Sequence, residues 1–324
     1  MIELLQQLLA VPAPSGAEDA RRAVIEKLAM PFADEIRTDV LGNLIVHKKG
    51  AGKRVLLAAH MDTIGMIATR VDEKGFVRFG ALGGLEVLDL QNIPVVFENG
   101  AAGVLSFESK TEAKKRKLHH CFIDVGEDAG VRIGDRASFE GALRRLGEHR
   151  ISAPYLDNTL GCAILLQVLR ELTESQYDLY LVFTVQEEVG LRGVKTAAFG
   201  IEPDVALAVD VTETGDLPES ATVMDVALGD GAAIKVMDRS IVCHPTLVRA
   251  LGAVAKRAGI ATQREILSDG GSDAGAIHLS RGGVVTGGVS VPVRYVHSPC
   301  EIADLRDCAA CEKLLLAALT QGTF

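Results

Sequence analysis

The chain has 324 residues, of which 48% are hydrophobic and only 4% aromatic, and it contains no tryptophan. This length suits one large domain plus a smaller one, with a mainly aliphatic core. A formal net charge of −9 argues against a nucleic-acid partner. The apolar stretches are short or interrupted by charge, which argues against a membrane span, and the first ten residues lack the basic start of a secretory signal.

The order of sequence patterns predicts an α/β fold. Helical patterns over 2–11 and 17–30 precede strand patterns over 44–47 and 55–60. From residue 156 onward the two kinds of pattern alternate: a helix after 158, a strand over 179–186, a helix near 193–199, a strand over 205–211 and a helix over 245–258. Such alternation predicts a mostly parallel central sheet flanked by helices.

Residues 66–153 differ in their hydrophobic pattern from the segments on either side. They consist of short alternating strand patterns and turns, for example IPVVFENGAAGVLSFES. This predicts a small all-β domain, inserted into a catalytic domain made of residues 1–65 and 154–324. A basic run within the insertion, residues 110–117 (KTEAKKRK), is interpreted as a solvated loop.

The first candidate for metal binding is the segment His60-Met61-Asp62, at the end of the apolar strand pattern over 53–60. Asp62 lies two residues after His60 and therefore on the same side of an extended chain. Its carboxylate can accept the second ring N–H of His60 and fix the tautomer that binds metal. A capped turn after a strand explains the same pattern without a metal.

Two further candidates flank helix and strand patterns in the second half. Asp157 precedes an apolar helical stretch over 160–172, and the two residues after it are natural N-caps, so simple capping also explains this position. His297 follows the strand pattern over 282–291 on a loop held by two prolines. Histidine is an ordinary metal ligand, although a lone one is more often structural.

Acidic residues directly follow one apolar strand pattern and lie inside a second one. Glu187 and Glu188 follow the strand over 179–186, where adjacent acids are costly unless something pairs them. Both serve one site only if the backbone turns there, which Gly190 permits. One would bind metal and the other would accept a proton from the attacking water, and adjacency does not say which. Asp210 lies within VALAVDV, where metal ligation is favoured over a hydrogen-bonded structural acid.

Together the five segments contain the parts of a two-metal hydrolase. Such a site requires a bridging carboxylate, one histidine and one carboxylate for each metal, and a spare carboxylate to act as base. Histidine and carboxylate ligands are used by zinc, cobalt and manganese, so we expect two divalent ions, with zinc or cobalt favoured and manganese also compatible.

Six motifs, taken together, carry a resemblance to a known family. HMDTIG, LDNTLG, TVQEEVGLRG, VDVTETGD, GGSDAGAIHLSRGG and RYVHSP occur in this order, and the match runs from near the N-terminus to about residue 307. The chain thus resembles the deblocking and glutamyl aminopeptidases, cytosolic metallopeptidases of the tetrahedral (TET) type. For this chain the resemblance implies that Asp157 bridges two metals. It assigns His60 and Asp210 to one metal, and Glu188 and His297 to the other.

The resemblance also assigns the remaining roles. It implies that Glu187 is the general base and that Asp62 orients His60. The glycine-rich run 268–275 (SDGGSDAG) lacks the spacing of a phosphate-binding loop, and its simplest role is a tight turn with Asp273 capping the next helix. Because this run matches one of the family's motifs, Gly271 and Asp273 are candidates for the substrate cleft.

The function implied is a cytoplasmic aminopeptidase that releases N-terminal residues from peptides. The resemblance further implies self-association into dimers and hollow dodecamers through the inserted domain. Two alternatives stay open. One is a dinuclear hydrolase of another bond, such as an N-acyl amino acid deacylase, or a glucanase as some relatives are labelled, although a glucanase needs paired carboxylates flanking a sugar. The other is a non-catalytic assembly protein, against which the intact Glu187 argues.

The six cysteines are unevenly distributed, which predicts buried free thiols in a reducing cytosol. Cys308 and Cys311 form a CxxC motif inside a helical pattern over 304–319. Since no second metal-binding pair accompanies them, a zinc or redox role is disfavoured.

Overall fold

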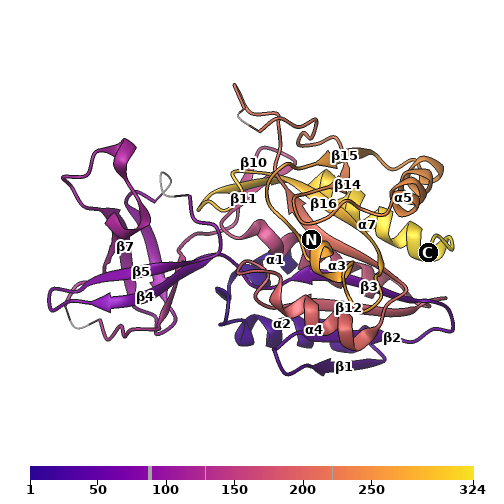
Figure 1. Ribbon diagram of the computed structural model, residues 1–324, viewed down its shortest axis with the longest axis horizontal. Helices are drawn as coiled ribbons and strands as arrows, with labels where there is room; N and C mark the ends of the chain where they lie inside the picture. Colours follow the sequence, from indigo (N-terminus) through magenta and orange to yellow (C-terminus); the bar gives the residue numbers. More distant parts are fainter. Residues whose placement is uncertain (87–89, 128, 221) are drawn as a thin grey trace.

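The computed structural model describes residues 1–86, 90–127, 129–220 and 222–324. Figure 1 shows a large α/β body that contains both chain termini and a smaller all-β lobe projecting from it. None of the helices in these ranges is long and apolar enough to cross a membrane. All six cysteines are free, and all but Cys300 are buried.

An 11-stranded mixed sheet forms the centre of the large body, in the order β1-β2-β12-β3-β13-β16-β17-β11-β10, with β14 and β15 joined to β16. Its strands are β1 (Glu35–Thr38), β2 (Leu44–Lys48), β3 (Arg54–His60), β10 (Arg144–Leu146), β11 (Arg150–Ala153), β12 (Asp178–Thr184), β13 (Val205–Thr212), β14 (Ala232–Met237), β15 (Thr262–Ile266), β16 (Val285–Arg294) and β17 (Glu301–Asp304). The four central strands, β12, β3, β13 and β16, are parallel. The predicted α/β class is therefore confirmed, while the flanks of the sheet are largely antiparallel.

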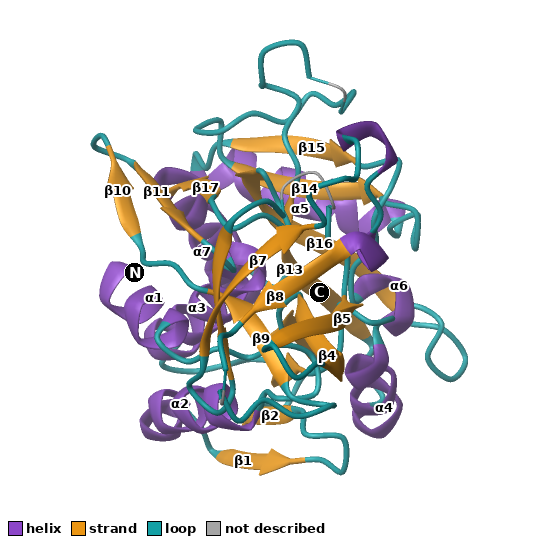
Figure 2. Ribbon diagram, turned by 90° about the vertical axis from the view of Figure 1, so that its left-hand side faces the viewer, coloured by secondary structure: helices purple, strands orange, loops and turns teal. Residues whose placement is uncertain are grey.

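Helices cover both faces of this sheet. They are α1 (Ile2–Leu9), α2 (Asp19–Ala29), α3 (Leu156–Glu171), α4 (Arg192–Ile201), α5 (Pro245–Ala258), α6 (Ala274–Ile277) and α7 (Leu305–Thr320). Along β3, Val55 and Leu57 face the larger core beneath α1, α3 and α7, whereas Leu56 and Ala58 face a smaller core beneath α4. This alternation follows from the two-residue period of a strand, and burial on both faces explains why β3 reads as a continuous apolar run. Figure 2 shows α1, α2 and α3 on one side and α4 and α6 on the other.

The smaller lobe is a closed barrel with the strand order β4-β5-β8-β7-β6-β9. Its strands are β4 (Gly65–Val71), β5 (Phe76–Leu82), β6 (Ile93–Phe97), β7 (Ala102–Phe107), β8 (Cys121–Asp124) and β9 (Arg136–Phe139). They enclose a separate apolar cluster that includes Val77, Leu105 and Ile123. The basic run over 110–117 is not only loop, because a short 3₁₀ helix spans Ala113–Lys115.

The barrel ends before the predicted limit of the insertion at residue 153. Strands β10 and β11 form a hairpin that pairs with β17 of the large sheet. Ile151 and Ala153 pack into the main core rather than into the barrel. The hydrophobic pattern of the sequence does not distinguish these two strands from the strands of the barrel, because both groups are short and antiparallel. Where the chain divides into domains stays a prediction.

Candidate active site

The parallel strands at the centre of the sheet bring the five candidate segments together. His60 is the last residue of β3, and it lies beside Thr184, the last residue of β12. Asp210 lies near the end of β13, the neighbour of β3 on the other side. Since parallel strands point their carboxyl ends to one edge, side chains from three distant parts of the sequence meet there.

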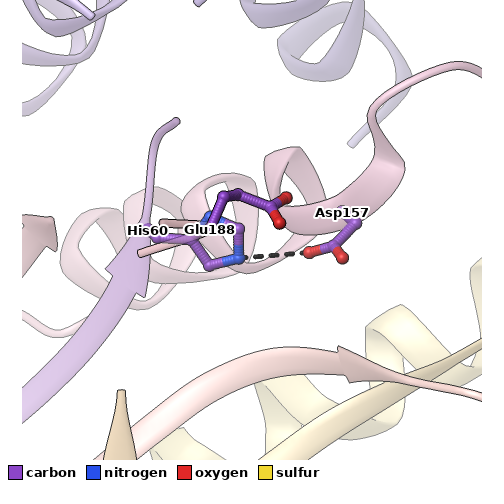
Figure 3. Close-up of side chains that lie close together, drawn as sticks. All are labelled: His60, Asp157 and Glu188. Atoms are coloured by element: carbon purple, nitrogen blue, oxygen red, sulfur yellow. Dashed lines mark hydrogen bonds and ion pairs between the residues drawn. The ribbon is translucent and has the colours of Figure 1, made fainter. Parts of the chain in front are cut away.

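One side of the cluster is built around His60. Its Nε2 atom lies 3.1 Å from Oδ1 of Asp157 and 3.5 Å from Oδ1 of Asp210. All three side chains are at least nine-tenths buried. Figure 3 shows the contact between the imidazole and the Asp157 carboxylate, with Glu188 alongside.

The other side of the cluster is built around His297. Its Nε2 atom lies 3.3 Å from Oδ2 of Asp157 and 3.3 Å from Oε2 of Glu188. The two oxygens of Asp157 therefore face two different histidines, and each histidine has a second carboxylate of its own. This is the geometry that a bridging carboxylate requires.

The residues present fit two divalent cations. In a tetrahedral zinc site with bond lengths of about 2.0–2.2 Å, neighbouring ligand atoms lie about 3.4 Å apart. The four nitrogen–oxygen distances in the cluster are 3.1–3.5 Å, which matches this spacing. In addition, Oε1 of Glu188 is buried and has no hydrogen-bond partner among the residues that the structure describes. A buried carboxylate oxygen without a partner is costly unless a cation satisfies it.

The electrostatics of the cluster favour positive charge. Burial disfavours the charged form of His297, but the carboxylates of Glu188 and Asp157 outweigh that effect and raise its pKa to about 12. Burial also raises the pKa of Glu187 well above its ordinary value, against the opposing charge of His60. Four carboxylates against two imidazoles thus leave an excess of acids in a buried site.

Glu187 and Glu188 reach one site because the backbone turns before them. Strand β12 ends at Thr184, two residues earlier than predicted, and Gln186 adopts a left-handed conformation with φ 55°. Gly190, the residue predicted to permit the turn, does have a positive φ of 121° but lies after the pair. Both glutamates line a cavity of ≈ 370 Å³ together with the two histidines and the two aspartates of the cluster.

Asp62 differs from its predicted contact. The ring atom Nδ1 of His60 bonds to the backbone carbonyl of Asp62 at 3.0 Å, while the carboxylate oxygen lies 3.7 Å away. The carboxylate instead accepts hydrogen bonds from the backbone N–H groups of Glu187 and Glu188 and from the hydroxyl of Ser15. The chain leaves the strand after His60, so the two-residue period no longer applies to Asp62.

Asp157 is held at a distorted helix start. Asp157 and Asn158 have non-helical backbone angles within α3, and Asn158 Oδ1 accepts the N–H of Gly161 as an N-cap does. The backbone N–H of Asp157 donates to Oε2 of Glu301, whose Oε1 accepts the N–H of His297. Glu301 was not among the predicted site residues, and its only signal in the sequence is its position as an acid four residues after His297.

A second missed residue is Arg21, which is buried in α2. Its guanidinium donates to the backbone carbonyls of Val11 and Met61 and to the hydroxyl of Thr159. It thereby joins the segment after β3 to the start of α3. No local motif marks an arginine that acts on distant backbone groups.

The glycine-rich run 268–275 is only partly at the cavity. Gly271 lines it, whereas Asp273 is not among the lining residues. The side chain of Asp273 does not cap α6 as predicted, and its Oδ2 atom accepts the hydroxyl of Thr184 at 2.6 Å. Burial raises the pKa of Asp273 to about 7.

The linker after the last residue of β5 also approaches the site. A Cβ atom at Gly83, which has φ 80°, would lie 2.9 Å from Oε2 of Glu188, and one at Gly84 would lie 2.9 Å from Nδ1 of His297. Only glycine permits so close an approach. The barrel is thus connected directly to the His297 side of the cluster.

Comparisons with known proteins agree with this arrangement. Residues 42–314 match the family described as M42 glutamyl aminopeptidase. A "putative aminopeptidase" of Acetivibrio thermocellus is 48% identical, with 98% of each chain covered. The aminopeptidase APDkam598 from the archaeon Desulfurococcus kamchatkensis has a TM-score of 0.95 and 37% identity, covering 99% of this chain and 94% of its own. The TET1 peptidase of Pyrococcus horikoshii, described as able to assemble into a tetrahedron or a large octahedral shell, has a TM-score of 0.89 and 31% identity, with 98% of each chain covered.

The fold and the matched family show that this protein is a peptidase, that is, a hydrolase that acts on peptide bonds. The chain belongs to the M42 glutamyl aminopeptidase family. As a metallopeptidase family, M42 implies divalent metal ions, and the clustered ligand atoms of His60, Asp157 and Glu188 lie within 4.8 Å of one another.

Proposed function

We propose that the protein is an aminopeptidase that holds two divalent cations and removes N-terminal residues from peptides. The observation that carries this proposal is the position of Asp157, whose two carboxylate oxygens lie 3.1 Å from His60 and 3.3 Å from His297. His60 and Asp210 would hold one cation, and His297 and Glu188 the other.

When bound, the cations act as Lewis acids that polarise a peptide carbonyl and favour ionisation of water. The chain itself supplies the proton acceptor. Glu187 lines the same cavity, but its carboxylate is paired with neither histidine of the cluster among the described ion pairs. It is free to take a proton from the attacking water at a carboxylate oxygen and to deliver it to the leaving amine.

The test of this proposal is the variant Glu187→Gln. Glutamine has nearly the same shape but cannot accept the proton, so kcat should fall by about 100-fold or more while both cations stay bound. Metal content is measured by elemental analysis beside turnover of aminoacyl-anilides. Glu174→Gln, an exposed position outside the cavity, is the matched control. A kcat close to that of the parent in a variant that holds two cations would refute the role of Glu187.

The native metal and the bond cleaved are tested together. Metal-stripped protein is reloaded with zinc, cobalt or manganese, all of which use histidine and carboxylate ligands. Each form is assayed on peptides with free and with acylated N-termini. Cleavage of acylated substrates alone would favour a deacylase, and loss of turnover on all peptides would favour a non-catalytic assembly protein.

We further propose that the chain self-associates. The support is its similarity over 98% of its length to a peptidase described as assembling into closed shells. Dimers built through the barrel, and a dodecamer built from them, are the expected species. A shell of this kind would admit peptides and exclude folded proteins. Light scattering of the metal-loaded protein measures the mass directly. A cytoplasmic location stays a prediction.

A further inference from the structure

The residues that line the cavity at the cluster fall into two chemically different groups. One part is the histidine–carboxylate cluster. Apart from Thr212 and Glu213, the rest is glycine and aliphatic, with Leu191, Val211, Leu267 and Val296 as its larger apolar side chains. Glu213 is the one further charged residue, and no lysine or arginine is present among the described lining residues.

Glu213 lies at the exposed edge of this cavity. It directly follows the last residue of β13, the strand that carries Asp210 into the cluster. Its Oε2 atom accepts the hydroxyl of Thr222 at 3.0 Å, which restrains the side chain without neutralising it. Its one described partner is this hydroxyl, so the carboxylate has no cation beside it.

The balance of charge makes Glu213 decisive for selectivity. The positive charge of two divalent cations would be balanced by the negative charges of the four carboxylates of Asp157, Glu187, Glu188 and Asp210. Glu213 then leaves the cavity with a surplus negative charge at its edge. An acidic side chain entering this cavity would meet that charge and find no lysine or arginine in the described part of the lining. A lysyl or arginyl side chain would pack its methylene groups on the aliphatic walls and place its cation near Glu213.

We propose that this cavity selects peptides whose N-terminal residue is basic, accepts aliphatic residues less well and rejects acidic ones, with Glu213 as the specificity-determining residue. This inference rests on the proposed aminopeptidase function. It separates this chain from a glutamyl preference, although the matched family is described as glutamyl aminopeptidase.

The size of the effect follows from the exposure of Glu213. Ion pairs of exposed groups contribute at most about 1 kcal/mol, which corresponds to about fivefold in an equilibrium constant. Attraction of a lysyl residue and repulsion of a glutamyl residue act in opposite directions on the two substrates. We therefore expect kcat/KM for a lysyl substrate to exceed that for a glutamyl substrate by about tenfold or more.

The experiment compares lysyl-, arginyl-, leucyl- and glutamyl-anilides in the metal-loaded protein and in Glu213→Gln. The control is Glu140→Gln, an exposed glutamate outside the cavity. In Glu213→Gln the KM for the lysyl substrate should rise about fivefold, with a clearly smaller change for leucyl and a lower KM for glutamyl. The preference of the parent for lysyl should also weaken as salt is added.

Three outcomes would overturn the inference. They are a parent protein that prefers glutamyl substrates, a Glu213→Gln variant with an unchanged ratio of lysyl to glutamyl turnover, and an equal loss on all substrates. The last result would mean that Glu213 binds the α-ammonium group common to every peptide.

A second measurement separates this inference from the proposed function. If no anilide is turned over, the proposed function fails, and calorimetric binding of lysinamide and of glutamic acid amide still decides the selectivity. Tighter binding of lysinamide that is lost in Glu213→Gln supports the inference, and equal binding of the two amides overturns it.

Discussion

Replacing Lys235 with methionine should destabilise the protein strongly. Lys235 lies in β14 and is buried, and its ammonium group contacts the buried carboxylate of Glu265 on the neighbouring strand. It also lies 3.1 Å from Oδ2 of Asp238. Asp238 in turn accepts the hydroxyl of Ser272 at 2.8 Å, beside the glycine-rich run at the cavity.

The magnitude follows from what the substitution leaves behind. Methionine fills much of the lysine's volume but leaves two buried carboxylates without their cation. Removing one partner of a buried ion pair typically lowers the free energy of unfolding by about 3–5 kcal/mol, and we therefore expect a loss of about 4 kcal/mol here. Unfolding entropy of about 2.1 cal/mol/K per residue gives roughly 0.7 kcal/mol/K for a chain of 324 residues. The expected fall in melting temperature is therefore about 4–7 °C.

Thermal and urea unfolding of the metal-free protein measure this loss. Lys256→Met, on the exposed side of α5, is the matched control and should change stability by less than about 0.5 kcal/mol. Adding Glu265→Gln to Lys235→Met should recover part of the loss, because one of the two unpaired charges is removed. A loss below about 1 kcal/mol for Lys235→Met would refute the reasoning, since it would mean that the carboxylates become neutral at little cost.

Three further predictions concern the metals, the acid range and the assembly. Asp157→Ala should lose both cations, whereas Asp210→Ala should chiefly weaken one, and two tightly held ions in Asp157→Ala on metal analysis would contradict the bridge. Burial opposes ionisation of Asp216, but hydrogen bonds from Arg294 outweigh it and lower the carboxyl pKa from 3.8 to about 2, so this pair contributes stability above about pH 4 that is lost as pH falls toward 2. Asp216→Asn should therefore cost about 2 kcal/mol at pH 7 in urea unfolding and progressively less below about pH 4, and a cost that does not change with pH would contradict the pKa. Excision of the barrel, with residues 65 and 140 joined by a short linker, should reduce the mass in solution, and an unchanged mass would place the subunit contacts on the large body.

Much of the fold was predictable because strands that are buried on both faces of a sheet have a recognisable sequence pattern. Strands β3 and β13 read as continuous apolar runs, since helices cover both sides of the central sheet. Polar residues at or near the ends of such runs are then conspicuous, which is why His60 and Asp210 were predicted as metal ligands. The barrel was equally visible from its short alternating strands.

The failures of prediction have a common physical cause. The contacts of Asp62 and the turn at Gln186 depend on where the chain leaves its strand, and strand ends are set by tertiary contacts rather than by local pattern. The pairing of the β10–β11 hairpin with the large sheet was not predicted, because its partner strand, β17, lies about 150 residues later in the chain. Arg21 and Glu301 bond to backbone groups far away in sequence, so they leave no local motif.

The ligands of the proposed centre are held in place through the main chain as well as through side-chain packing. Asp62 accepts N–H groups from Glu187 and Glu188, at 2.9 and 3.3 Å, and so fixes the turn that carries them. Glu301 accepts the N–H groups of two further ligands, Asp157 and His297, at 2.9 and 3.0 Å. Hydrogen bonds from N–H groups to a charged carboxylate are among the stronger ones in proteins. Two buried acids that need not touch a cation thus position the backbone of four residues at the cavity. This explains how side chains from five segments, two of them on loops, converge with spacings as narrow as 3.1–3.5 Å.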